Sequence, residues 1–470
     1  MTFSIISLTY ISSYMLSSIG EHLLSGILLI LLSLWLYMYY YRRSGGILLC
    51  PAGLFSLSWI GGSGISAFQL SNLQTDWLPE TWIVIFGMAA AFLLAYEAVT
   101  GEKWQKRIPM KYDKGIGGEP ESEDGLSLRE ESIFTAIVIF ITAFLSLSAF
   151  IFEAVKLQYI PLFTEDMPHA YSYFHITGVH YFTTAFVLLP SEAAVYLMLR
   201  KKEGSPLRFC LMDAAVCFCA FLGLLLPVLL VSRFQLILSV ALCIFTILII
   251  RRESLQGLLS GRRLILSLLI AISALGLYIF LTIERAHSVE YLRSIFEMKD
   301  PGLPIWVIQP YIYVANNFDN LNCLVRDLSQ HTHGLRMLYP LLVFTGIKFF
   351  HPELVSFPIY VTKEELTTLT IAYDAYYDFG ILGVVIFALI LGALMGLIEM
   401  RIMRRGSRCR YMLWYVTAAQ PVFYLALSFF TTWYSNPSTW FYMGASAMSY
   451  VFICICMKIS EKRRQHGKGL

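Results

Sequence analysis

Residues 364–396 read EELTTLTIAYDAYYDFGILGVVIFALILGALMG, and we expect the rest of the chain to be arranged around this stretch. Its first half is polar and contains the acidic and aromatic run YDAYYDF, whereas its second half is apolar enough to cross a bilayer. Thr362 and Glu365 have the spacing of a capping box, which predicts that a helix begins here. The pattern therefore predicts a helix whose polar end leads directly into a membrane span.

Hydrophobic residues make up 57% of the 470 residues and charged residues only 14%, and long apolar runs recur along the whole chain. A helix needs roughly 20 apolar residues to cross a bilayer, and it satisfies its own backbone polar groups there. We therefore predict an all-α polytopic membrane protein with 11–12 transmembrane helices, the twelfth depending on whether the apolar N-terminus crosses or lies in the interface. The eleven qualifying segments are 22–41, 47–67, 81–96, 133–154, 179–199, 208–231, 234–250, 264–283, 380–400, 412–431 and 438–457.

The basic residues are distributed unevenly between the loops that join these segments. When successive loops are assigned to alternate sides, 26 of the 35 Lys and Arg residues fall on one side, which the positive-inside rule makes cytoplasmic. The C-terminus is then cytoplasmic. The predicted organisation is N-terminal spans in 1–96, a cytoplasmic linker in 97–131, central spans in 132–283, a large extracytoplasmic loop in 284–379, and C-terminal spans with a cytoplasmic tail in 380–470.

The long outer segment contains most of the polar chemistry predicted for that side. Residues 288–298 and 317–330 place apolar side chains at helical spacing, so each is expected to form an amphipathic helix on the membrane or on the bundle. The apolar run 338–350 is too short to span a bilayer and is predicted to be re-entrant or interfacial. Cations and imidazoles gather between these pieces at Arg326, His331, His333 and Arg336.

Arg233 and its neighbours Ser232 and Gln235 form the only polar break in a run of more than thirty apolar residues. An arginine at such a depth needs an anion or a group of carbonyls to receive it. Two interpretations remain open. The side chain either reaches the outer headgroups or binds an anionic substrate such as a diphosphate.

Several common functional motifs are absent from the sequence. It contains no P-loop, dinucleotide fingerprint, CxxC pair, HExxH or GxSxG motif, so ATP-driven transport, redox chemistry and common hydrolase mechanisms have no support. No ligand cluster with metal-binding spacing is visible either. We therefore expect no metal, no other cofactor and no nucleic-acid partner.

A set of short motifs carries a resemblance to a known family. They are YIPLF followed by GVHYF, the SRFQLIL turn, the PYIYVANNFDNL segment, and TTLTIAYDAYYDFGILG leading into a span that ends in GALMG. In order and spacing, from about residue 133 to the end, the set resembles the Wzy-type oligosaccharide repeat-unit polymerases, which are related to O-antigen polymerases and ligases. The resemblance implies a GT-C-like membrane glycosyltransferase of surface polysaccharide (O-antigen, capsule or exopolysaccharide) biosynthesis.

The resemblance also implies the substrate and the partners. Repeat units linked to a polyprenyl diphosphate such as undecaprenyl diphosphate would be joined at the outer face of the cytoplasmic membrane. A sugar hydroxyl of the acceptor attacks the anomeric carbon of the donor, and the polyprenyl diphosphate leaves. A flippase and a chain-length regulator would be its protein partners, and the lipid bilayer its surroundings.

Such a reaction needs a base for the attacking hydroxyl. Asp374 and Asp378 are the first candidates, because residues four apart share one face of a helix. His331 and His333 are competing candidates. The alternative interpretation of the two aspartates is a solvated helix end whose negative charge complements the helix dipole.

The reaction also needs positive charge for the leaving diphosphate and groups that contact the sugars. Arginine suits phosphate better than lysine because it can bind in a bidentate manner, so Arg233 is the main candidate, supported by Arg326 and Arg336. Candidate substrate contacts are Tyr373, Tyr377 and Asn317. Asn316, Asn317 and Asn320 are equally compatible with a turn at the start of a helix.

Two rival functions stay open. A ligase that transfers finished glycan to another acceptor would share the donor chemistry of a polymerase. A flippase or other transporter of lipid-linked oligosaccharide is less favoured, because the two halves show no repeated pattern and because transporters rarely concentrate 96 residues on one face.

Overall fold

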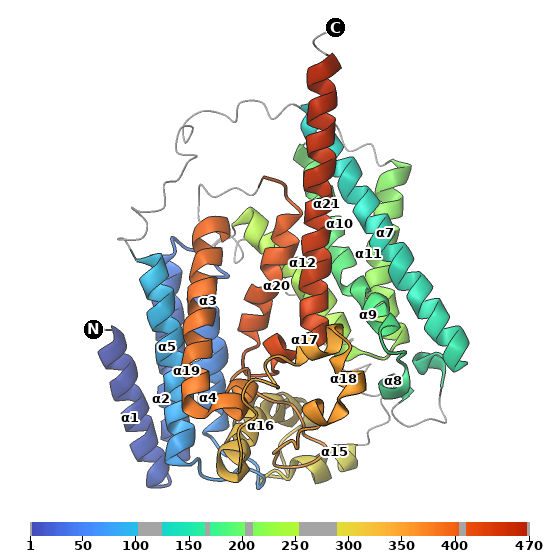
Figure 1. Ribbon diagram of the computed structural model, residues 1–470. Helices are drawn as coiled ribbons and strands as arrows, with labels where there is room; N and C mark the ends of the chain where they lie inside the picture. The colour runs from blue at the N-terminus through green and yellow to red at the C-terminus, as the bar shows by residue number, and fades with distance from the viewer. Residues whose placement is uncertain are drawn as a thin grey trace. The chain divides into compact units, whose positions relative to one another are not determined.

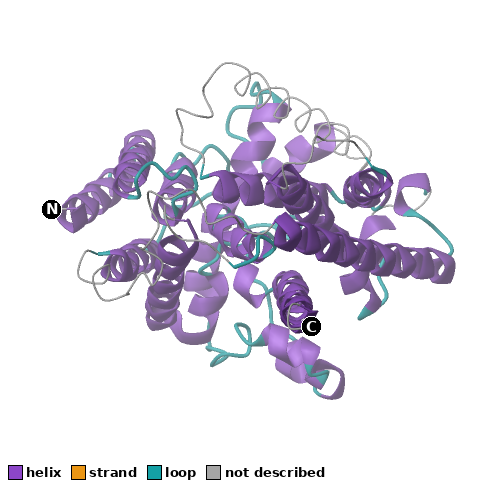
Figure 2. Ribbon diagram, turned by 90° about the horizontal axis from the view of Figure 1, so that it is seen from above, coloured by secondary structure: helices purple, strands orange, loops and turns teal. Residues whose placement is uncertain are grey.

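The computed structural model describes residues 2–101, 125–164, 170–202, 210–252, 289–403 and 410–467. Helices account for the regular structure of these residues, and no strand occurs among them (Figure 2). Eight of the described helices are long and apolar enough to cross a membrane. The chain is thus an all-α, multi-pass membrane protein, as its composition predicts.

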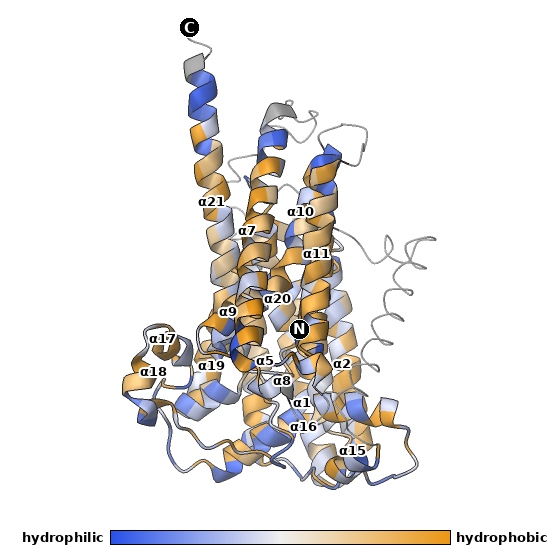
Figure 3. Cartoon of the chain, turned by 90° about the vertical axis from the view of Figure 1, so that its right-hand side faces the viewer, coloured by the Kyte–Doolittle hydropathy of each residue, from blue (hydrophilic) through white to orange (hydrophobic). Residues whose placement is uncertain are grey.

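The eight helices coincide with most of the predicted spans. They are α2 (His22–Arg43), α5 (Pro79–Thr100), α7 (Gly125–Leu157), α9 to α10 (Val179–Lys202), α11 (Leu211–Leu229), α12 (Arg233–Arg251), α19 (Tyr373–Ile398) and α21 (Pro437–Gly467). In Figure 3, α21 is largely hydrophobic along its shaft and becomes hydrophilic toward its C-terminal end, where the predicted basic tail lies. The linker predicted at 97–131 falls mostly outside the described residues.

Three predicted spans have no counterpart among these eight helices. Segment 264–283 lies outside the described residues. Segment 47–67 forms a short helix in three parts, α3 (Pro51–Phe55), η1 (Ser56–Ile60) and α4 (Gly61–Ser66), and segment 412–431 contains α20 (Trp414–Ala426), which is also short. Most residues of both short helices are buried within the protein. A buried helix and a membrane span have equally apolar sequences, so the apolar runs did not distinguish them.

The described helices belong to two compact units. Unit 1 comprises Met1–Pro109, Ser288–Arg401 and Tyr424–Trp440, and its long helices α1 (Thr2–Ser18), α2, α5 and α19 run side by side in Figure 1. Unit 2 comprises Met110–His287, Ile402–Phe423 and Phe441–Leu470, and in it α10 packs against α7, α11 and α12. Each unit therefore has its own set of apolar helices.

The predicted outer segment belongs to unit 1. Its helices are α15 (Val289–Phe296), α16 (Ile305–Asp327), α17 (Tyr339–Phe344) and α18 (Ile347–Phe350), and Figure 1 shows them gathered at the end of the unit where α19 begins. The structure confirms a helix within 288–298, and the run 338–350, predicted to be re-entrant or interfacial, contains the two short helices α17 and α18. It differs for 317–330, because α16 begins earlier and is buried along its second half instead of lying on a surface.

The helix predicted to begin at Thr362 does not form. Residues 361–372 form bends, turns and irregular loop, and α19 begins at Tyr373. The Thr362 hydroxyl donates to Asn316 Oδ1 over 2.7 Å, and its backbone N–H donates to Asn320 Oδ1 over 2.8 Å. Thr362 therefore meets α16 instead of capping a helix, and the capping-box prediction is wrong.

The closest helix contact in unit 1 joins α5 to α19 through glycines. A Cβ added to Gly392 would overlap the carbonyl of Phe92, and one added to Gly396 would lie 3.0 Å from Val99 Cβ. The GxxxG spacing of these two glycines therefore allows the backbones to approach, as in other membrane helix pairs.

Replacing Gly392 with alanine is expected to destabilise unit 1 by about 1–3 kcal/mol, because the new methyl group pushes α19 away from the Phe92 carbonyl. The thermal midpoint of the detergent-solubilised protein measures this. Gly87→Ala on α5 is the matched control, since its Cβ would make an ordinary 3.5 Å contact with Val385. Equal midpoints for the two variants would contradict the tight contact at Gly392.

Candidate functional site

The loop 331–337 is attached to the first turns of α19 by the carboxylate of Asp378. This side chain is fully buried. It accepts hydrogen bonds from the Thr332 hydroxyl, from the Arg336 backbone N–H (3.2 Å) and from the Met337 backbone N–H (2.8 Å). The backbone N–H of His333 donates to the Asp378 carbonyl over 3.2 Å. Asp378 therefore positions the loop, and both of its carboxylate oxygens are already occupied.

Asp374, one turn earlier on the same helix, meets the side chain of Arg336. Arg336 Nε lies 2.5 Å from Asp374 Oδ1, and the Ser435 hydroxyl donates to Asp374 Oδ2. The Arg336 side chain is 12% exposed and that of Asp374 is 5% exposed. The Nη groups of Arg336 make no hydrogen bond to any residue that the structure describes. The guanidinium therefore keeps donors for an added anion.

Three aromatic rings surround the Arg336 guanidinium. Its central carbon lies 4.5 Å from the ring centroid of Tyr377, 5.5 Å from that of Tyr373 and 5.6 Å from that of Phe357. The Tyr373 hydroxyl is held in turn by both backbone polar groups of Tyr360, at 2.9 and 3.0 Å. The rings fix the position of the cation and interact favourably with its charge.

A cavity of about 400 Å³ opens beside this pair. It is formed by the loop before α19, the start of α19 and the segment before α21, all of which belong to unit 1. Its lining residues are Arg336, Tyr339, Val355, Phe357, Ile359, Asp374, Thr432, Ser435, Asn436 and Pro437. Its volume is typical of a site for a small polar group or a few sugar rings.

The turn that follows the two aspartates requires a glycine. The backbone of α19 departs from helical angles at Phe379 (φ −143°, ψ 18°) and Gly380 (φ 61°, ψ −149°). The conformation of Gly380 is one that residues with a Cβ rarely adopt. The break separates the polar first turns of the helix, which face the cavity loop, from the apolar part that follows.

The two candidate histidines lie close to α19 but are absent from the cavity lining. Both are exposed. His331 Nδ1 lies 3.2 Å from the carbonyl oxygen of Tyr377, and its ring is 6.2 Å from that of Tyr376. The contact with a carbonyl means that Nδ1 carries the proton, which leaves Nε2 as the acceptor. The ring of His333 lies 6.3 Å from that of Phe379.

The other candidates lie away from this cavity or belong to the other unit. Arg326 is half exposed and pairs with its neighbour Asp327 at 2.8 Å, which raises the pKa of the arginine. Asn317 is buried in α16, where its amide donates to the Tyr313 carbonyl over 2.6 Å. Arg233 is the first residue of α12, belongs to unit 2 and is buried.

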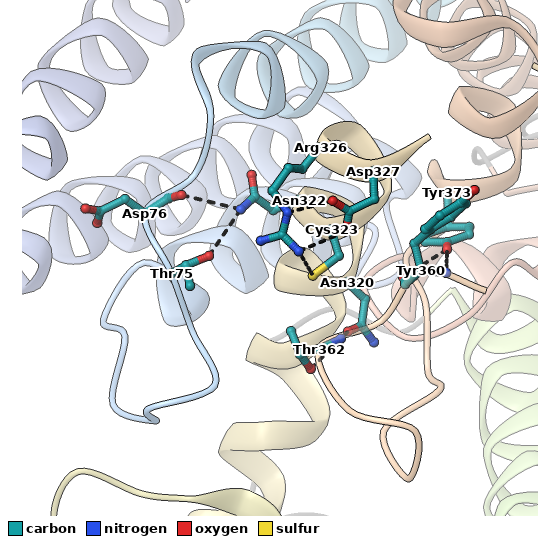
Figure 4. A network of polar contacts seen from close by, with 10 residues as sticks. All are labelled: Thr75, Asp76, Asn320, Asn322, Cys323, Arg326, Asp327, Tyr360, Thr362 and Tyr373. Carbon is teal, nitrogen blue, oxygen red and sulfur yellow. Dashed lines mark hydrogen bonds and ion pairs between the residues drawn. The ribbon is translucent and has the colours of Figure 1, made fainter. Parts of the chain in front are cut away.

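The asparagines of α16 connect this helix to the chain segments around it (Figure 4). Asn320 donates to the carbonyls of Leu366 and Thr368, at 2.7 and 2.8 Å, and accepts from Thr362. Asn322 accepts hydrogen bonds from the Leu78 N–H and the Thr81 hydroxyl, at 3.0 and 2.7 Å. Asn320 and Asn322 are therefore structural and lie inside the helix, not in a turn at its start.

A buried carboxyl group, Asp319, lies on the same helix. It accepts hydrogen bonds from Gln74 Nε2 (2.7 Å), Trp77 Nε1 (2.9 Å) and the Ser66 hydroxyl (3.3 Å). Burial nevertheless dominates and raises its pKa from 3.8 to about 7. Burial disfavours the charged carboxylate, and no cation among the described residues contacts Asp319 to offset this.

This pKa predicts a pH dependence of stability. Between pH 4 and 7 the folded protein holds a proton on Asp319 that the unfolded chain releases, so the free energy of unfolding falls as the pH rises through this window. In Asp319→Asn, the contribution of this residue to the change of the free energy of unfolding with pH disappears. Thermal midpoints of the detergent-solubilised wild type and variant, measured at intervals from pH 4 to 8, test it. Parallel curves would contradict the prediction.

Two features of the described structure are not among those predicted from the sequence. Ser435 and the aromatic wall at Phe357 lie 61 and 17 residues from Asp374, and no local motif marks them. In unit 2, the buried carboxylate of Glu153 on α7 accepts a hydrogen bond from the Thr183 hydroxyl (2.7 Å) and lies 3.1 Å from His180 Nδ1. The sequence signal that could have indicated the contact of Glu153 with His180 is the position of this acid within an apolar run.

Comparisons with known proteins do not assign the chain to a family: no protein-family model, no curated protein and no solved structure matches it.

Proposed function

We propose that this protein is an integral membrane glycosyltransferase that polymerises oligosaccharide repeat units carried on a polyprenyl diphosphate, at the outer face of the cytoplasmic membrane. The observation that carries the proposal is the largely buried Arg336–Asp374 pair in a cavity whose lining includes the aromatic rings of Tyr339 and Phe357. It combines a cation for a diphosphate, a carboxylate for a proton and aromatic faces for sugars. The resemblance of the sequence motifs to Wzy-type polymerases supports the same chemistry.

In this proposal Arg336 binds the diphosphate of the donor through its Nη donors. The acceptor hydroxyl forms a bond to the anomeric carbon of the donor sugar, and the bond from that carbon to the diphosphate oxygen breaks. The hydroxyl proton passes to Asp374, and the polyprenyl diphosphate leaves with its charge balanced by Arg336.

The positions of the two aspartates relative to the cavity favour Asp374 over Asp378 as the base, although both oxygens of Asp374 accept hydrogen bonds, from Arg336 and from Ser435. Asp378 is fully buried and holds the loop 331–337 in place, whereas Asp374 lines the cavity. His331 remains the competing base, since its Nε2 is the acceptor nitrogen. The ligase alternative uses the same donor site and differs only in the acceptor.

The test is chain extension by the purified protein in nanodiscs, supplied with polyprenyl-diphosphate-linked repeat units from the same pathway. Wild type is expected to convert them into a ladder of longer products. Asp374→Asn is expected to lose extension and His331→Gln to keep it; the reverse result moves the base to His331. Transfer only to a different acceptor lipid would establish a ligase. Unchanged repeat units, with all components shown to be intact, would refute the proposal.

A further inference from the structure

The short helices α17 and α18 expose several apolar side chains. Together with the chain that leads from them to residue 359, they form what we call the α17–α18 hairpin, residues 338–359. Its exposed apolar side chains are Leu338, Leu341, Phe344, Ile347, Phe349, Phe350 and Ile359, with exposures from 37% to 81%. Figure 3 shows hydrophobic colour on both short helices. Seven exposed apolar side chains within 22 residues indicate contact with lipid or with another apolar ligand.

The hairpin begins beside the point where α19 becomes apolar. A Cβ added to Gly334 would lie 3.5 Å from the Phe379 ring and 3.8 Å from Leu338, so these residues are neighbours. Directly after Phe379, α19 exposes Ile381 and Leu382 as a bilayer-facing helix does. The apolar surface of the hairpin is therefore continuous with the beginning of a membrane-spanning helix.

The same hairpin also contributes to the Arg336 cavity. Tyr339, Val355 and Phe357 line the cavity, and Ile359 lines it and is 50% exposed. The largely buried cation of Arg336 thus lies beside a hairpin that exposes apolar side chains. This arrangement complements a molecule with an anionic head and a long hydrocarbon tail.

We propose that the α17–α18 hairpin binds the first isoprene units of the prenyl chain while the diphosphate lies at Arg336. The inference rests on the proposed function, which supplies the diphosphate, and names the part of the protein that receives the lipid. The occupant is the prenyl chain of the substrate and not bulk phospholipid, because the apolar surface joins the cavity at Ile359 and the cation lies within that cavity.

The experiment uses the full-length protein in nanodiscs and farnesyl diphosphate with a diazirine on its second isoprene unit. After irradiation, peptides are mapped by mass spectrometry. We expect the label within residues 338–359, and we expect excess undecaprenyl diphosphate to reduce it by about tenfold. The double variant Leu341→Ser/Phe344→Ser and the variant Arg336→Gln are each expected to lower labelling by about fivefold or more, since one removes apolar contact and the other the anion site.

Leu8→Ser on α1 is the matched control, because Leu8 is as exposed as the hairpin leucines but lies on another helix of unit 1. It is expected to leave labelling unchanged. Label spread over the bilayer-facing helices, or equal labelling of the hairpin by a diazirine phospholipid, would overturn the inference. Chain extension measured on the same preparations separates the two ideas. Extension without hairpin labelling refutes the inference alone, and competed hairpin labelling without extension refutes the proposed function alone.

Discussion

Replacing Arg336 with glutamine is expected to slow chain extension by a factor on the order of 100 or more, which is typical for the loss of one group that stabilises transition-state charge. The variant removes the cation at the proposed diphosphate site. It also leaves the carboxylate of Asp374, which is 5% exposed, without its ion-pair partner. The initial rate of appearance of two-unit products by purified protein, normalised to folded protein, measures the effect.

Two further variants separate charge from geometry. Arg336→Lys keeps the charge but lacks the planar fork and the flat contact with Tyr377, so we expect a loss of about tenfold. Arg326→Gln is the matched control from the same unit, because Arg326 is half exposed and paired with its neighbour Asp327. It is expected to stay within about threefold of wild type. A wild-type rate for Arg336→Gln would remove Arg336 from the mechanism.

Replacing Asp378 with alanine is expected to destabilise the protein by about 2–4 kcal/mol, the cost of leaving several buried donors without acceptors. Asp378 is fully buried, and the N–H groups of Arg336 and Met337 both donate to it. Without it, the loop that carries the Arg336 side chain loses its attachment to α19. The thermal midpoint in detergent should fall, and chain extension should be lost with it.

Asp374→Asn provides the contrast one turn away. Asparagine keeps the shape of aspartate, its one side-chain oxygen can accept from Arg336 or from Ser435, and three aromatic rings still contact the guanidinium, so the thermal midpoint should fall less than that of Asp378→Ala. Its rate of extension should nevertheless fall strongly if Asp374 accepts the proton. If Asp378→Ala instead melts as wild type does and only loses activity, Asp378 acts in the chemistry and the assignment of the two residues reverses.

Part of the site follows from the sequence because its residues are close neighbours on one helix. The spacing of Asp374 and Asp378 predicts that they share a face of α19, and the contacts of both with the loop 332–336 agree with this. The sequence does not distinguish their environments. That depends on a loop about forty residues earlier, whose N–H groups meet Asp378 and whose guanidinium meets Asp374. Arg233 was preferred as the phosphate-binding arginine only because it interrupts an apolar run, and an apolar run does not show which residues the arginine contacts.

The sequence by itself determined that this is an all-helical membrane protein and where most of its long helices lie, because bilayer crossing leaves a local signature of about twenty apolar residues. It also indicated, from its length, that the apolar run 338–350 is too short to span a bilayer. Only the tertiary structure showed that segment 47–67 is a short buried helix and that the asparagines of α16 bind neighbouring chain segments. Burial and hydrogen-bond partners depend on contacts between residues far apart in the chain, such as Asp374 with Arg336 and Ser435, and no local pattern records those contacts.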